Sequence, residues 1–326
     1  MQFDTVGSLI SNTIKTFSVG YDRINKTNVF TSGDPISGTI TLEVTKDCKV
    51  QSLCIKLRGN AKVRWNEGSG KNIEILQSRE KYFSILQFII QDHQDNNVVT
   101  KGVHVYPFTF QIPTQQLPSS FFSKCGRVQY TLEANLSRPK KLDSKAKTVV
   151  TFIQKTDLNG DPALMAPQHS IIDRRMKFLN SGTVGMDVKV GRTGFHQGEG
   201  IQVLASIQSS SSVYSKHSFF AAGKRKVDTD EILKEVGEAI PPSAFGTVTR
   251  TFTIPPDTSV SILNCDILRV EYRLKVYLDV KYALDPEVTF PIVILPALEV
   301  KAVNPTGESE DGSNCDTQSP PAASET

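Results

Sequence analysis

Clusters of basic residues carry the clearest chemical signal in this sequence. They are Lys56, Arg58, Lys62 and Arg64; Lys224, Arg225 and Lys226; and Arg174, Arg175 and Lys177. Residues at alternate positions of a strand share one face, so the first cluster should project from a single side of a sheet. Such groups suit acidic lipid head groups or phosphorylated tails, at about 1 kcal/mol per basic group near an anionic surface. We treat the first two clusters as candidate contacts for cargo or acidic lipid; an ordinary solvated face is the alternative.

Motifs for enzyme chemistry are missing from the sequence. The five histidines are scattered and form no HExxH pattern, so we expect no metal site. The chain has no GxGxxG fingerprint, no P-loop and no GxSxG elbow, and we expect no cofactor. Cys125 lies beside Lys124 and Arg127, which could lower its thiol pKa, but we favour an ordinary loop cysteine beside surface charges. We therefore expect a protein that is not an enzyme.

The composition bears on which classes of partner the protein binds. The chain has 326 residues, with 38% hydrophobic and 22% charged residues, which is typical of a folded protein. Its net charge of +3 comes from 37 basic and 34 acidic residues. This balance, and the lack of aromatic residues among the basic clusters, argue against nucleic acid as a partner.

The sequence also indicates a compartment. No signal-peptide pattern follows Met1, and the longest apolar run, near Phe290–Leu298, is interrupted by two prolines and is shorter than the ~20 residues that span a bilayer. The five cysteines form no CxxC pair, which favours free thiols in a reducing compartment. We expect a soluble, cytoplasmic protein.

Alternating polarity predicts the elements that position these residues. Gly38–Val44, Val50–Leu57, Val128–Leu136 and Val270–Val280 each place apolar residues on one side and polar residues on the other, as half-buried antiparallel strands do. Turn residues separate them at intervals typical of β-sandwiches. Asp228–Glu238 is the exception. Its apolar residues have helical spacing, and an irregular strand connection is the alternative.

Three short motifs recur in the same order. Phe30–Asp34 is repeated at Phe195–Glu199, Phe108–Pro113 at Phe252–Pro255, and Arg127–Leu132 at Arg269–Leu274. The last two pairs share one offset along the chain. An ordered repeat of this kind predicts two similar β-sandwiches in tandem.

Changes in composition set the predicted boundaries. We expect an N-terminal β-sandwich over residues 1–155, a turn-rich hinge over 156–177 and a C-terminal β-sandwich over 178–298. Residues 299–326 have few apolar side chains and an acidic composition, which predicts a disordered acidic tail. The predicted fold is all-β, with two tandem immunoglobulin-like antiparallel sandwiches.

Several motifs together resemble the α-arrestin (arrestin domain-containing protein) family. They are Ser32–Gly38, Ile55–Trp65, Val105–Pro113, Pro118–Phe121, Leu164–Gln168, Gly194–Glu199 and Ile262–Tyr272, and the likeness covers residues 14–298. The resemblance implies two arrestin domains and an adaptor that binds cytoplasmic regions of membrane receptors or transporters. It further implies recruitment of HECT-type ubiquitin ligases at the plasma membrane and endosomes, so that cargo is ubiquitinated, internalised and sorted.

Two departures from the family bear on this expectation. The family recruits ligases through Pro-Pro-x-Tyr, which docks on WW domains. Here Pro241, Pro255 and Pro320 each begin a Pro-Pro pair, and none is followed by tyrosine at the fourth position. Three routes stay open: another ligase contact, pairing with a motif-bearing relative, or action without ubiquitin. In addition, about ten residues are missing around Ser209–Tyr214 relative to the family, which predicts a lost or shortened strand and an exposed sheet edge.

Three other classes of function stay open at this point. A non-catalytic arrestin-fold coat or scaffold subunit of a protein-transport complex would form a large, stoichiometric assembly. An extracellular adhesion sandwich would carry disulfides, which the odd number of cysteines disfavours. An enzyme with a non-local catalytic triad is not ruled out by motifs alone.

Overall fold

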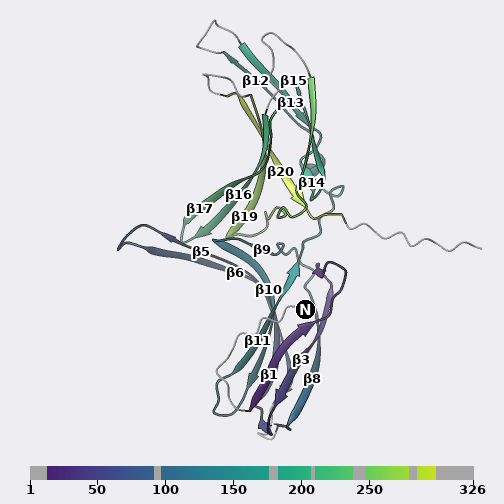
Figure 1. Cartoon of the computed structure of the whole chain (residues 1–326), viewed down its shortest axis with the longest axis vertical. Helices are drawn as coiled ribbons and strands as arrows, with labels where there is room; N and C mark the ends of the chain where they lie inside the picture. The colour runs from purple at the N-terminus through teal and green to yellow at the C-terminus, as the bar shows by residue number, and fades with distance from the viewer. Residues whose placement is uncertain are drawn as a thin grey trace, which may run out of the picture.

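The computed structural model describes residues 13–91, 97–175, 183–206, 210–237, 247–278 and 285–298. Figure 1 shows two β-sandwiches stacked along the long axis, with β1 to β11 forming the first domain and β12 to β20 the second. Across the described ranges no helix is long and apolar enough to span a bilayer. The prediction of two tandem sandwiches is confirmed.

Two sheets face each other in the first domain. The smaller has the order β1 (Ile14–Tyr21), β3 (Pro35–Val44), β8 (Gly102–Gln111). The larger has the order β2 (Val29–Phe30), β11 (Ser144–Phe152), β10 (Gly126–Ser137), β5 (Ser52–Glu67), β6 (Glu74–Gln91), and β9 (Phe121–Phe122) also pairs with β10. The short strands β4 (Cys48–Lys49) and β7 (Val98–Val99) pair with each other.

The second domain repeats this plan. One sheet has the order β12 (Gln168–Arg175), β13 (Thr183–Val190), β15 (Gly200–Ser206), β18 (Thr247–Thr253). The other has the order β14 (Gly194–His196), β20 (Glu287–Leu295), β19 (Leu268–Tyr277), β16 (Ser210–Ala221), β17 (Lys224–Glu235). One helical turn, α1 (Pro162–Met165), and β12 lie within the segment predicted as the hinge.

The main hydrophobic core runs through both domains. Along β3 and β5 buried residues alternate with more exposed ones, which is the period-two pattern that the sequence predicts. Phe219 and Leu268 of the second domain belong to the same buried cluster as Tyr130 and Ala61 of the first. The two sandwiches are therefore packed against each other through side chains that neither exposes to water.

The internal repeat extends to individual hydrogen bonds. Tyr130 Oη donates to the Pro118 carbonyl oxygen at 2.7 Å, and Tyr272 Oη donates to that of Ser259 at 2.5 Å. Both tyrosines are buried, and burial raises the pKa of both hydroxyls, so they remain protonated donors. Equivalent strands, β10 and β19, thus bind the loop that precedes them in the same way in each domain.

The turn that begins the repeat is also duplicated. Gly33 has φ 82° and Gly198 has φ 79°, a left-handed conformation that favours glycine. The acidic residue after each glycine accepts a hydrogen bond from the turn backbone: Asp34 from the Thr31 amide at 2.7 Å, and Glu199 from the His196 amide at 2.8 Å. The sequence repeat therefore reflects a shared turn chemistry.

The expected helix over Asp228–Glu238 is wrong. Its residues up to Glu235 form strand β17, which pairs with β16 in a hairpin with one bulge. A helix of this length is marginal on its own in water. The hairpin instead lets Ile232 and Leu233 pack on the core cluster, and this tertiary contact outweighs the helical spacing.

The segment with the predicted deletion is only partly described. Residues 207–209 lie outside the described part of the chain, while Ser210–Tyr214 belong to β16. The strands on either side, β15 and β16, are both present and paired with neighbours. The predicted tail, residues 299–326, and Lys177 lie outside the described residues, as do the side chains of Arg174 and Arg175.

Candidate functional site

The first basic cluster lies on the outer face of β5. The strand buries Leu53, Ile55 and Leu57 in the core, so the residues between them point the other way. Lys56, Arg58, Lys62 and Arg64 all occupy this outer face, and the shared face that their spacing predicts is confirmed.

Neighbouring strands enlarge this group. Lys62 lies opposite Arg127 on β10 and opposite Arg79 on β6, and Lys81 lies opposite Asn60. We name the whole group the basic face. Its members are Lys56, Arg58, Lys62, Arg64, Arg79, Lys81, Arg127, Lys145 and Lys147. The five residues outside β5 could not be found from the β5 pattern, because finding them requires the register of four strands.

The basic face has little acidic counter-charge. Glu133 on β10 lies between Lys56 and Lys147, and Asp143, which accepts from Asn135 Nδ2 at 3.0 Å, lies at the border. Within the described ranges no side chain of the basic face forms an ion pair. The corresponding sheet face in the second domain carries acidic residues such as Glu231, Glu271 and Glu287 among its basic ones. The basic charge is therefore specific to the first domain.

The second basic cluster is divided between two sides of β17. Arg225 points outward, where its guanidinium donates to Ser218 Oγ at 2.9 Å and lies 5.6 Å from the Phe220 ring centroid. Lys224 Nζ instead lies 2.8 Å from Glu67 Oε2 and 2.8 Å from Glu74 Oε2, across the domain boundary. These two carboxylates raise the pKa of Lys224. The cluster is therefore not one continuous surface.

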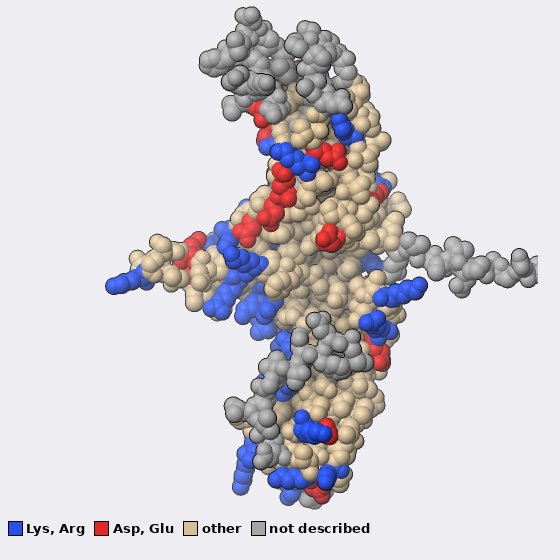
Figure 2. All heavy atoms as spheres, viewed as in Figure 1, with Lys and Arg blue, Asp and Glu red and all other residues tan. Residues whose placement is uncertain are grey.

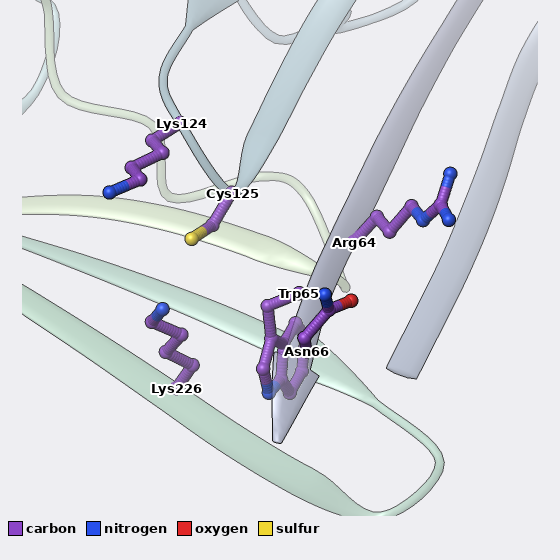
Figure 3. Close-up of a pocket in the computed structure, with 6 residues that line it drawn as sticks. All are labelled: Arg64, Trp65, Asn66, Lys124, Cys125 and Lys226. Carbon is purple, nitrogen blue, oxygen red and sulfur yellow. The ribbon is translucent and has the colours of Figure 1, made fainter. Parts of the chain in front are cut away.

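Lys226 borders an open recess of about 430 Å³ at the junction of the domains. The recess is lined by Arg64, Trp65, Asn66, Lys124, Cys125 and Lys226. In Figure 3 the Lys124 and Lys226 chains approach the Cys125 side, whereas the Arg64 guanidinium points away from it. Cys125 lies in the loop before β10, as its sequence neighbours suggest, and its side chain is buried. The recess brings basic groups of both domains together.

The inner side of the β5–β6 hairpin binds the second domain. Glu80 Oε2 accepts from the Asp266 amide at 2.9 Å and from Cys265 Sγ at 3.3 Å, and Tyr82 Oη donates to Cys265 Sγ at 3.3 Å. Burial raises the pKa of the Cys265 thiol to about 11, so the thiol stays protonated at neutral pH. Glu80 and Tyr82 therefore face the second domain, while Arg79 and Lys81, which lie between and beside them, face outward.

Figure 1 shows β5 and β6 curving away from the body of the first domain, with the ends of β16 and β17 beside them. In Figure 2 lysine and arginine atoms gather where this hairpin leaves the body, while acidic atoms follow the second domain above it. The geometry separates two roles. One side of the hairpin joins the domains, and the other offers uncompensated positive charge to a ligand.

Comparisons with known proteins agree with this architecture. The family model described as Arrestin (or S-antigen), N-terminal domain, matches residues 17–159, and Arrestin (or S-antigen), C-terminal domain, matches residues 180–297. Rat thioredoxin-interacting protein is 30% identical over 298 residues, which cover 86% of this chain and 74% of that protein. The chain belongs to the α-arrestin family.

Other α-arrestins show the same extent of similarity. Human arrestin domain-containing protein 4 is 28% identical over 284 residues, covering 81% of this chain and 68% of its own. Human thioredoxin-interacting protein is 29% identical over 300 residues, covering 86% and 74%. Arrestin-family proteins are generally non-catalytic adaptors, so this α-arrestin is an arrestin-type adaptor at the level of its family.

Proposed function

We propose that this α-arrestin binds cytoplasmic regions of membrane receptors or transporters and promotes their endocytosis and endosomal sorting. In this proposal the protein is cytoplasmic and is recruited to the plasma membrane and endosomes together with its cargo. The observation that supports it most is the basic face, whose cations have no ion-pair partners among the described residues.

Charge complementarity is the physical basis of the proposal. Clustered cations of one sign attract acidic segments from a distance and raise the rate of encounter. Lys62, Arg79 and Arg127 lie side by side on three strands, so their mutual repulsion is relieved when an anionic partner binds. Acidic residues in the cytoplasmic segments of the cargo, or an acidic membrane surface beside those segments, would be such a partner.

We also propose that ligase recruitment, where it occurs, is indirect or uses a different contact. The 326 residues contain no Pro-Pro-x-Tyr, the polyproline-type motif that WW domains bind. A motif-bearing relative that binds the same cargo would supply it. Purified full-length chain should therefore fail to bind WW domains of HECT-type ligases that bind such a relative; binding near the relative's affinity would instead reveal a direct site.

Charge reversal in cells tests the cargo role. The variant Lys56→Glu, Arg58→Glu, Lys62→Glu, Arg64→Glu removes the β5 part of the basic face. A matched control, Lys189→Glu, Lys216→Glu, Arg269→Glu, Arg273→Glu, makes the same change in net charge on the second domain. We expect wild type and control to accumulate on cargo-bearing membranes and the first variant to stay diffuse. A wild-type protein that remains diffuse while cargo is internalised would refute the proposal.

A further inference from the structure

We propose that Leu86 and Phe88 form an apolar anchor site at one end of the basic face. The partner that fits is a linear peptide segment with an aromatic or aliphatic residue at one end and an acidic run about seven residues away. This inference rests on the proposed function, since it specifies which segments of cargo the protein would select.

The two anchor residues are large and exposed. Leu86 is 45% exposed and Phe88 is 48% exposed, and both lie on the outer side of β6, opposite Lys56 and Cys54 of β5. Residues two apart on a strand lie on the same face, so the two side chains are neighbours. Burying one such side chain against a ligand stabilises a complex enough to change affinity by about tenfold or more. An apolar pair beside a basic face therefore suits a ligand that has both apolar and acidic residues.

The opposite end of the basic face has a different character. Arg64, Lys62, Arg79 and Arg127 occupy adjacent positions near the outer part of the hairpin, where the strand register places no acidic residue on the same face. Near the anchor, Glu133 offsets Lys56 and Lys147. The positive charge thus increases with distance from Leu86 and Phe88. A ligand with acidic residues at one end and an apolar residue at the other would bind in one direction only.

Strand geometry sets the spacing of the ligand. The row that contains Lys62 lies about seven residues along β5 from the rows that pair with Leu86 and Phe88. At about 3.3 Å per residue this is roughly 23 Å, a span that an extended peptide crosses with about seven residues. The acidic run and the anchor residue of the ligand must keep this separation to bind both ends.

Shape favours a peptide over a membrane. β5 and β6 curve away from the first domain, so the face that they carry is bent along its length (Figure 1). A planar bilayer would meet only part of a bent face, whereas a flexible segment follows it. The curvature of β5 and β6 therefore favours a peptide segment as the ligand. Binding to vesicles tests the alternative, a membrane surface.

Fluorescence anisotropy with the purified full-length chain tests the anchor. Peptide one carries four acidic residues and a phenylalanine seven positions away; peptide two has the same composition with the phenylalanine next to the acidic run; peptide three has alanine in place of phenylalanine. We expect peptide one to bind about tenfold tighter than the other two. Equal affinities for the three peptides would overturn the anchor site.

Variants localise the effect. Leu86→Ser with Phe88→Ser should weaken peptide one to the level of peptide three and leave peptide three unchanged. Ile171→Ser, a 60% exposed residue in the second domain, is the control and should change nothing. If the double variant loses binding to vesicles rich in phosphatidylserine while no peptide binds, the face contacts membrane and the peptide inference is wrong. Failure of every peptide with intact recruitment to cargo in cells would refute the anchor alone and leave the proposed function standing.

A natural cysteine gives an independent readout. Cys54 lies opposite Phe88, and it is partly exposed, whereas Cys48, Cys125 and Cys265 are buried. Peptide one should slow alkylation of Cys54, followed by mass spectrometry of its tryptic peptide, and peptide three should slow it less. Unchanged alkylation of Cys54 at saturating peptide one would place the ligand elsewhere and overturn the inference.

Discussion

Among single residues, one buried tyrosine in each domain holds a loop against the sheet. Tyr130 and Tyr272 occupy equivalent positions of β10 and β19, and each hydroxyl donates to a carbonyl in the segment before its strand. Each carbonyl belongs to a loop that serine side chains also tie to the end of the neighbouring strand: Ser119 and Ser120 in the first domain, and Ser261 in the second. The tyrosine hydroxyl adds a buried hydrogen bond to each of these loops from the strand that follows it.

Removing either hydroxyl should therefore destabilise the protein. We expect Tyr130→Phe and Tyr272→Phe each to lower the free energy of unfolding by about 1–3 kcal/mol, because a buried carbonyl loses its donor. Chemical denaturation monitored by fluorescence measures the change. Tyr214→Phe is the control, since the Tyr214 hydroxyl bonds Glu231 at an exposed site and its loss should cost under about 0.5 kcal/mol. Equal losses of stability for the three substitutions would contradict a stabilising role of the two buried hydroxyls.

Residue patterns predicted some of these features and missed others for physical reasons. The repeat that contains Tyr130 and Tyr272 is visible in sequence, and so is the shared face of Lys56 and Arg64, because period two is a local property. The carbonyl that each tyrosine reaches is not visible, since it depends on how a loop folds back. Arg79 and Arg127 likewise join the basic face only through strand register.

At the scale of elements, the β5–β6 hairpin has two chemically different sides. Its inner side places Glu67, Glu74 and Glu80 against the second domain, and its outer side carries the basic face. Alternation along two strands is enough to separate acidic from basic residues. The sequence predicted the β5 part of the basic face, whereas the role of Glu67 and Glu74 on the inner side depends on Lys224 of β17, which lies beside them.

The start of β10 packs tightly against the second domain. Gly126 has no room for a side chain, because an added Cβ would lie 2.9 Å from both Leu268 and Phe219, which are fully buried. We expect Gly126→Ala to lower the free energy of unfolding by about 1–3 kcal/mol through overpacking. Thermal denaturation tests this. Gly191→Ala, where nothing lies within 4 Å, should be neutral or slightly stabilising, and a comparable loss there would show that backbone effects dominate.

At the scale of the whole molecule, one core joins two domains, and a histidine lies at the junction. The His217 ring meets the Phe121 ring edge-on, with centroids 5.3 Å apart, and Asp228 pairs with His217 in the β16–β17 register. Burial lowers the pKa of His217 below its usual 6.5, and the nearby charges of Asp230 and Asp228 only partly oppose this. The folded protein therefore binds a proton at His217 less readily than the unfolded chain.

This shift predicts a pH dependence with a definite sign. Between pH 6.5 and the lowered pKa of His217, the unfolded state binds more protons, so stability falls as pH decreases. The loss amounts to about 1.4 kcal/mol per unit of pKa shift. Denaturation midpoints at pH 7.5, 6.5 and 5.5 should fall for wild type and fall less for His217→Phe. His104→Phe, at an exposed site, should keep the wild-type slope; identical slopes for all three proteins would contradict this role of His217.

The sequence predicted the two-domain architecture but not the contacts between distant segments of the chain. Strand alternation predicted two sandwiches, and the comparison with α-arrestins agrees. The strand β17 was missed, because Ile232, Leu233 and Val236 have helical spacing and only the tertiary partner β16 decides against a helix. The packing of Gly126 against Phe219 was equally out of reach, since no local pattern relates residues so far apart in the chain.

The two domains share a fold and differ in the charge of their outer sheet faces. Both domains have the glycine turn with its acidic cap and the buried tyrosine. The outer sheet faces did not stay alike, since one is almost purely basic and the other mixes charges. The shared turns and tyrosines maintain the fold, whereas the charge of the outer face differs between the domains. The second domain is thus an internal control for experiments on the basic face, because it has the same fold and a different surface charge.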